Sequence, residues 1–159
     1  MEVDMTTGIR RTAVVAVTAG LLLAGGLAAP ALAAEASPPG SHQAARQIGV
    51  VEKVTAFYDQ YLDAINGTNP NMDPTEVRNE FLTPELNARL DDWAEENMAD
   101  PVFRAQNTPE SRDVRYEGSG AGHATVIVTE HFGDGSTIDV WYRVPLDGGR
   151  ISDLKDAPQ

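Results

Sequence analysis

The spacing of apolar residues changes near residue 112, and this change most constrains the fold. Before residue 112, apolar residues recur every three or four positions, as on one face of a helix. After it, they alternate with polar residues, as on a strand with one buried side. Helices followed by strands are typical of an α+β domain, so we expect N-terminal helices packed on a curved, four-stranded antiparallel sheet.

Three helices are predicted in the first half. The longest spans about residues 44–66 and ends before Gly67. Asp73-Pro74 begins a short second helix that ends near Phe81, and Thr83-Pro84 begins a third. The apolar positions of the first helix are Ile48, Val51, Val54, Phe57, Tyr58, Tyr61, Leu62 and Ile65, and those of the third are Leu86, Leu90, Trp93 and Ala94.

Four strands are predicted in the second half, with glycine-rich turns between them. The first begins at Arg112, and the turns lie at residues 118–122, 133–136 and 147–149. The last strand is expected at Arg150–Leu154. The inward positions of the second strand are Ala124, Val126, Val128 and Phe132, and those of the third are Ile138, Val140, Tyr142 and Val144. Consecutive hairpins predict an antiparallel meander, with the helices across one face.

Residues 1–34 have the pattern of a signal peptide. Arg10 and Arg11 precede an apolar run, and Ala31-Leu32-Ala33 is a cleavage site of the A-x-A type. The run of about 17 small residues is short for a membrane span, so cleavage is favoured over an uncleaved anchor. We therefore expect a secreted, extracytoplasmic protein, exported by the general or the twin-arginine route. It would consist of a flexible leader over residues 35–46 and one α+β domain over residues 47–157.

The chain is acidic and contains no cysteine. Residues 1–34 hold two of its 24 acidic and two of its 12 basic side chains, so 22 and 10 remain and the net charge of that part is −12. Binding to nucleic acid or to an anionic membrane demands a basic patch, so neither partner is expected after signal cleavage. The absence of cysteine excludes disulfides, thiol catalysis and zinc–thiolate sites.

Several stretches of the chain resemble a known group of folds. They are Val54–Leu62, Phe81–Leu86, Asp100–Asn107 and Arg150–Leu154. Over about residues 48–156 the chain resembles the cystatin-like and nuclear-transport-factor-two-like folds, and among these a bacterial family of exported domains of unknown function. The resemblance implies a long helix packed into a curved sheet, with a conical cavity between them. It departs at Gly149-Arg150, where such families usually have a Trp, and it implies no chemistry.

Five residues are candidates for a ligand site: Tyr58, Tyr61, Trp93, Asp100 and Gln106. Under the resemblance, Asp100 and Gln106 border the cavity, where a carboxylate beside an amide would orient a small polar ligand. Alternatively, Asp100 caps a turn before Pro101, and Gln106 bonds nearby backbone. The three aromatic residues either line a pocket with polar tips pointing inward or belong to the ordinary core.

A second candidate site is the outer face of the third strand. Trp141 lies there between Asp139 and Arg143, and an exposed aromatic side chain flanked by charges is typical of a partner surface. Alternatively, Arg143 stacks on Trp141 or a loop covers it.

His123 and His131 stand too far apart on one strand to share a metal ion. We expect neither a metal site nor a cofactor.

The sequence contains no motif of nucleophilic catalysis, phosphate binding or metal hydrolysis. We therefore expect an exported, non-catalytic module that binds a small ligand or a protein, with the ligand, partner and oligomeric state left open. The alternative is a cavity enzyme of isomerase or hydrolase type, with Asp100 as base and Tyr58 or Tyr61 as donor. An inhibitor, immunity or envelope-structural role is a third reading.

Overall fold

The computed structural model describes residues 39–158, which fall within one compact unit and form three helices followed by four strands. The helices are α1 (Pro39–Asn66), α2 (Pro74–Phe81) and α3 (Pro84–Asn97), and the strands are β1 (Ser111–Gly120), β2 (His123–His131), β3 (Thr137–Pro145) and β4 (Asp153–Asp156). The expected α+β class is confirmed. The expected signal peptide, residues 1–34, lies outside the described residues.

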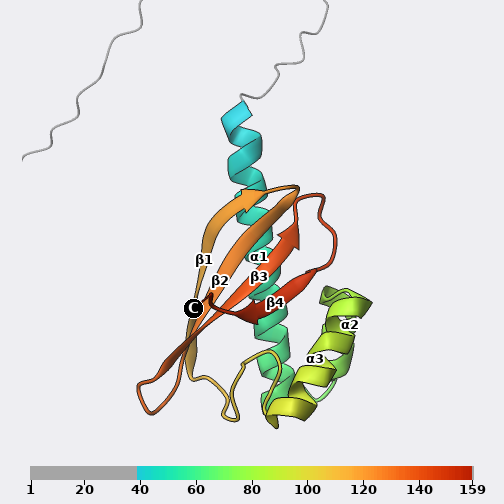
Figure 1. Ribbon diagram of the computed structural model, residues 1–159, viewed down its shortest axis with the longest axis vertical. Coiled ribbons are helices and arrows are strands. Elements are labelled where there is room, and N and C mark those ends of the chain that lie inside the picture. The colour runs from blue at the N-terminus through green and yellow to red at the C-terminus, as the bar shows by residue number, and fades with distance from the viewer. Residues whose placement is uncertain (1–38, 159) are drawn as a thin grey trace, which may run out of the picture. The chain divides into compact units, whose positions relative to one another are not determined.

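The four strands form the predicted antiparallel meander, in the order β1-β2-β3-β4 (Figure 1). Val128 of β2 lies opposite Val114 of β1 and Val140 of β3, so the three valines lie side by side across the sheet. The β1–β2 turn consists of Ala121 and Gly122, which have φ angles of 50° and 79°. Left-handed conformations at both positions suit a tight two-residue hairpin turn.

The last strand begins later than predicted. β4 starts at Asp153, whereas Ile151 forms a parallel bridge with Leu82, just after α2. The backbone N–H of Ile151 donates to the carbonyl of Phe81 (2.8 Å), and the N–H of Thr83 donates to the carbonyl of Ile151 (3.0 Å). The expected strand is therefore divided, and its first part ties the α2–α3 junction to the sheet.

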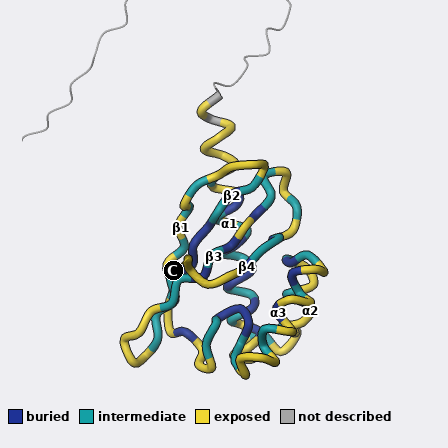
Figure 2. Tube along the Cα trace, viewed as in Figure 1, coloured by how far each residue is buried: buried dark blue, intermediate teal, exposed yellow. Residues whose placement is uncertain are grey.

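Helix α1 packs along one face of the sheet, but only part of its length is covered (Figures 1 and 2). The structure differs from our expectation for residues 39–46, which form the first turns of α1 instead of a flexible leader. Ile48 and Ile65, expected on the buried face, are 57% and 40% exposed. Ile48 precedes Phe57 by nine residues, which places it on the opposite side of the helix. No helix within residues 39–158 is both long and apolar enough to span a membrane.

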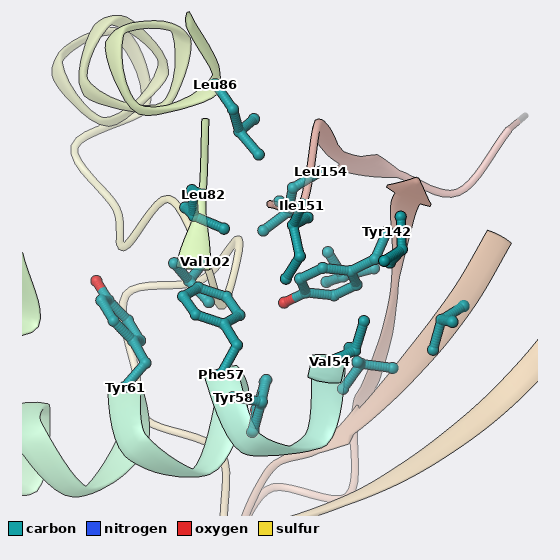
Figure 3. Close-up of a cluster of buried hydrophobic side chains, with 14 of the residues drawn as sticks. Val54, Phe57, Tyr58, Tyr61, Leu82, Leu86, Val102, Tyr142, Ile151 and Leu154 are labelled. Carbon is teal, nitrogen blue, oxygen red and sulfur yellow. The ribbon is translucent and has the colours of Figure 1, made fainter. Parts of the chain in front are cut away.

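The core fills the space between α1 and the sheet. Figure 3 shows Val54, Phe57, Tyr58 and Tyr61 of α1 gathered with buried residues from elsewhere in the chain. The ring centre of Phe57 lies 6.2 Å from that of Tyr142, and the ring centres of Tyr58 and Tyr61 lie 5.6 and 5.4 Å from that of Phe103. These rings occupy the region where the resemblance implied a conical cavity.

The start of α2 is capped as predicted. Asp73 Oδ1 accepts hydrogen bonds from the backbone N–H groups of Thr75 (2.8 Å) and Glu76 (3.1 Å). Asp73→Ala should lower the free energy of unfolding by about 1 kcal/mol, because two N–H groups lose their acceptor. Urea denaturation would measure the loss, with Asp73→Asn as the control that keeps a capping oxygen. Equal stability of the alanine variant and the wild type would contradict this role.

Candidate binding groove and buried polar cluster

Asp100 caps the turn that follows it. Its Oδ1 accepts hydrogen bonds from the backbone N–H groups of Val102 (2.8 Å) and Phe103 (2.9 Å), and its Oδ2 accepts one from the Tyr61 hydroxyl (2.9 Å). A backbone bridge between Asp100 and Ala105 closes the same turn. Both carboxylate oxygens therefore have partners, and this geometry supports the capping alternative over a ligand-binding one.

The other four candidate ligand residues do not line one pocket. Tyr58 and Tyr61 are core residues, 0% and 3% exposed. Trp93 is half-buried and lies under the guanidinium of Arg104, whose Cζ is 4.3 Å from the ring centre. Gln106 is exposed and borders a small pocket of about 100 Å³. Only Tyr61 and Asp100 are joined by a hydrogen bond, so the predicted ligand site is not assembled from these residues.

The outer face of β3 is only partly covered by its neighbours, because Asp139 and Trp141 are half-buried and Arg143 is exposed. Trp141 lies opposite Ile127 of β2, and Ile127 is only 1% exposed. The Thr129 hydroxyl donates a hydrogen bond to Asp139 (2.6 Å), and Arg115 also contacts Asp139 (3.3 Å). The hydrogen bond from Thr129, aided by Arg115, lowers the pKa of Asp139. Asp139 is thus engaged within the sheet, and a partner surface on this face stays a prediction.

The Arg143 side chain points toward the N-terminal end of β2. Its Nη2 lies 3.3 Å from the Nδ1 of His123. Arg143 and half-buried Trp141 also border a pocket of about 190 Å³ beside the end of the described chain, at Pro158.

A groove of about 880 Å³ lies between the N-terminal half of α1 and the connection from β3 to β4. The helix lines it with residues spaced three or four apart, which therefore share one face: His42, Ala45, Arg46, Gly49, Val50 and Lys53. The other wall runs from Val144 to Gly148. The sequence pattern does not indicate this groove, because it predicts a flexible leader over residues 39–46 and because the wall from β3 is distant in sequence.

Lys53 joins the two walls of the groove. Its ammonium group donates hydrogen bonds to the carbonyl oxygens of Gly148 (2.5 Å) and Gly149 (2.7 Å). Gly148 has a φ of 87°, a conformation that favours glycine, and Asp147 Oδ1 accepts a hydrogen bond from the N–H of Gly149 (2.9 Å). The turn after β3 is therefore fixed by its own residues and by α1.

The groove has an excess of positive charge in an acidic protein. Ten Arg and Lys side chains occur in the described residues, and five of them form ion pairs: Arg78, Arg89, Arg104, Arg112 and Arg115. Arg46 and Lys53 have no carboxylate partner within residues 39–158, and both line the groove. Asp147 is the one acidic residue among the described groove-lining residues.

A second feature is a polar cluster inside the core, formed by Glu130, Tyr58, Tyr142 and Arg104. Glu130 is 0% exposed on the inner face of β2, and neither carboxylate oxygen has a hydrogen-bond partner within the described residues. Burial raises the pKa of Glu130 to about 8. The nearby Tyr58 hydroxyl and the positive charge of Arg104 lower the pKa of Glu130 in part, and the negative charge of Asp100 raises it further. The raised pKa favours the protonated, uncharged form of Glu130 at neutral pH.

The groups around Glu130 are enclosed as well. The hydroxyl groups of Tyr58 and Tyr142 are buried without a hydrogen-bond partner in the described residues, and burial raises the pKa of both tyrosines. Arg104 donates to the carbonyl of Leu154 (3.0 Å), and its side chain is 7% exposed. None of the pockets described above is lined by Glu130, so this acid is shielded from ligands.

Glu130 is not among the predicted site residues, although the alternation along β2 contains a signal for it. Residue 130 shares the two-residue period of Val126 and Val128, which predicts an inward side chain. Its cross-strand neighbour on β1 is Arg112, which instead pairs with Asp59 of α1. A glutamate at an inward position of a strand is unusual enough to mark a buried polar site. Within residues 39–158, no three His, Asp or Glu side chains are grouped to hold a metal ion.

Comparison with known proteins finds a likeness in structure. No family model and no curated protein matches the chain. A crystal structure of a protein of unknown function from Bacteroides thetaiotaomicron VPI-5482 is similar, with a TM-score of 0.58 and 23% sequence identity. The match covers 73% of this chain and 95% of that one. At this identity the likeness concerns the fold alone, an arrangement of helices and an antiparallel sheet that this chain shares with a solved protein of unknown function.

Proposed function

We propose that the chain is an exported, non-catalytic binding module whose ligand site is the groove between α1 and the β3–β4 connection. The observation that carries this proposal is a groove of about 880 Å³ with an apolar floor and two basic side chains that lack carboxylate partners in the described residues. Small-molecule sites generally have volumes of about 300–1,000 Å³, with mainly apolar walls and a few polar groups. The groove fits this description.

The groups with catalytic potential support binding over catalysis. Asp100 accepts two hydrogen bonds from its own turn and one from Tyr61, so it has little capacity left to act as a base. Glu130 has the raised pKa of an acid catalyst, but it is enclosed in the core. The alternative function, a cavity enzyme with Asp100 as base and Tyr58 or Tyr61 as donor, therefore has less support.

Export and the finer fold assignment are parts of the same proposal. The basic start, apolar run and A-x-A site of residues 1–34 support export. The long first helix on an antiparallel meander supports a cystatin-like or nuclear-transport-factor-two-like fold. N-terminal sequencing of protein from the culture medium tests export, and a start near residue 34 or 35 is expected.

A substitution at Gly49 tests the groove. Gly49 lies on the groove face of α1, and a Cβ atom added there would meet no other atom within 4 Å. Gly49→Phe should therefore place a ring in the groove without disturbing the core. Gly49→Ala is the matched control, and it should stabilise the helix by up to about 1 kcal/mol.

The probe for this test is 8-anilinonaphthalene-1-sulfonate, an apolar anion that fluoresces when it leaves water. The wild type and Gly49→Ala should bind it with similar affinity, and Gly49→Phe should bind it at least about tenfold more weakly, the equivalent of about 1.4 kcal/mol. In the wild type, NMR signals of Gly148 and Gly149 should shift during the titration. Equal binding by the phenylalanine variant would exclude the groove as the ligand site.

A further inference from the structure

We propose that the ligand of this groove is an apolar monoanion whose acid group binds at Lys53. This inference rests on the proposed function and goes further, because it names the chemical class of the ligand and the group that recognises it. It follows from three properties of the groove: the chemistry of its floor, the hydrogen bonds of Lys53 and the distribution of charge along its walls.

The floor of the groove favours an apolar body. Val50 and Val144 lie at the bottom of the groove and are 6% and 0% exposed, so the apolar surface open to a ligand comes mainly from half-buried Pro145 and Leu146. Gly49 leaves additional space beside Val50, because it has no side chain. A hydrocarbon segment placed there would be stabilised by the removal of its apolar surface from water. A fully polar ligand would gain nothing from this surface.

Lys53 is ordered to receive an acid group. An ammonium group has three N–H donors, and two of them are directed to the carbonyl oxygens of Gly148 and Gly149. The third remains for a ligand. Because the side chain is half-buried and already held in place, little conformational entropy is lost when an anion binds there.

Arg46 contributes differently, because it is exposed. Its Nε donates to the carbonyl of His42 (3.2 Å), and the side chain lies two helical turns before Lys53 on the same face. Exposed ion pairs add little affinity, but they increase the rate at which a charged ligand arrives. Lys53 is therefore the anchor, and Arg46 guides the ligand into the groove.

The remaining charges favour a single negative charge on the ligand. Asp147 lies on the opposite wall, one residue before the carbonyl group that Lys53 binds, and the chain carries a net charge of −12. A second acid group near Lys53 would meet this carboxylate. Polyanions such as nucleotides are therefore disfavoured. A single carboxylate on an apolar chain can bind Lys53 without placing a second negative charge beside Asp147.

Dodecanoate and dodecanol, kept below their aggregation limits, test this inference by calorimetric titration. The wild type should bind dodecanoate at least about tenfold more tightly than dodecanol, because the alcohol lacks the charge that Lys53 recognises. Lys53→Met should weaken dodecanoate binding at least about tenfold more than dodecanol binding, and so remove this preference. Arg46→Gln should slow association of dodecanoate and have a smaller effect on its affinity.

Each other outcome has a distinct meaning. If the wild type binds both compounds equally and Gly49→Phe abolishes both, the groove is a ligand site but the anion assignment is wrong. If Lys53→Met weakens both compounds equally, Lys53 acts only by holding the turn, and the assignment is again wrong. If neither compound binds and the dye binds Gly49→Phe as tightly as the wild type, the proposed function fails together with this inference.

Discussion

Glu130→Gln should make the protein more stable than the wild type at pH 8 and above, and should remove most of a pH dependence that the buried acid creates. The ordinary pKa of a glutamate is 4.5, and burial raises that of Glu130 to about 8. Between these values the unfolded chain releases a proton that the folded chain retains. Each pH unit in this range therefore lowers the free energy of unfolding by ~1.4 kcal/mol.

The effect is fully developed above about pH 8 and absent below about pH 4.5. Over the whole range, the loss from this one group reaches at most about 5 kcal/mol. Glutamine has a similar shape and no titration, so the difference in unfolding free energy between variant and wild type should grow in favour of glutamine as the pH rises. Urea denaturation at pH 5, 6.5 and 8 measures this difference.

Glu96→Gln is the matched control, because Glu96 is exposed on α3. Its difference from the wild type should stay small and nearly constant with pH. If Glu130→Gln behaves like Glu96→Gln, the carboxyl group of Glu130 is ionised in the folded protein, and the enclosed cluster does not exist as described.

Phe57→Ala should lower the free energy of unfolding by about 3–5 kcal/mol, the largest loss expected from a core substitution in α1. Phe57 is fully buried, and its ring centre lies 5.8–6.2 Å from those of Phe81, Tyr61 and Tyr142. Removing the ring leaves a cavity among these aromatic residues. Because a domain of this size has a total stability of only about 5–15 kcal/mol, the variant should unfold at a much lower temperature.

Ile48→Ala on the same helix is the contrasting substitution. Ile48 is 57% exposed, so its removal should change stability by no more than about 0.5 kcal/mol. Thermal unfolding followed by circular dichroism, together with urea denaturation, compares the two variants. A similar loss in both would mean that α1 is rotated relative to the sheet from the position described.

The contrast between these residues shows the limit of periodicity. Helical spacing predicted α1 and identified Val54, Tyr58 and Tyr61 as buried, which is confirmed. It also assigned Ile48 to the buried face, because a spacing of three or four residues is loose enough to include a residue on the opposite side of the helix from Phe57. The sheet covers only part of α1, and the extent of that cover is a tertiary property (Figure 2).

The divided last strand has the same cause. An alternating pattern identified Ile151 and Leu154 as inward positions, and both are buried. The hydrogen-bond partner of Ile151 was not predictable, because a backbone N–H and carbonyl group can pair with any extended segment that the fold places beside them. Leu82 lies there only because the α2–α3 pair is folded against the edge of the core.

The sequence by itself determined the class of fold, the order of the helices and strands, the cap at Asp73 and the antiparallel connections. These depend on local spacing, on capping side chains and on short turns, all of which act between residues close together in the chain. Only the tertiary structure decided that Asp100 caps its turn, that Glu130 is enclosed, and that Lys53 meets the carbonyl groups of Gly148 and Gly149. The last two depend on contacts between residues separated by tens of positions in the chain, and the first is one of two uses of Asp100 that the local sequence left open.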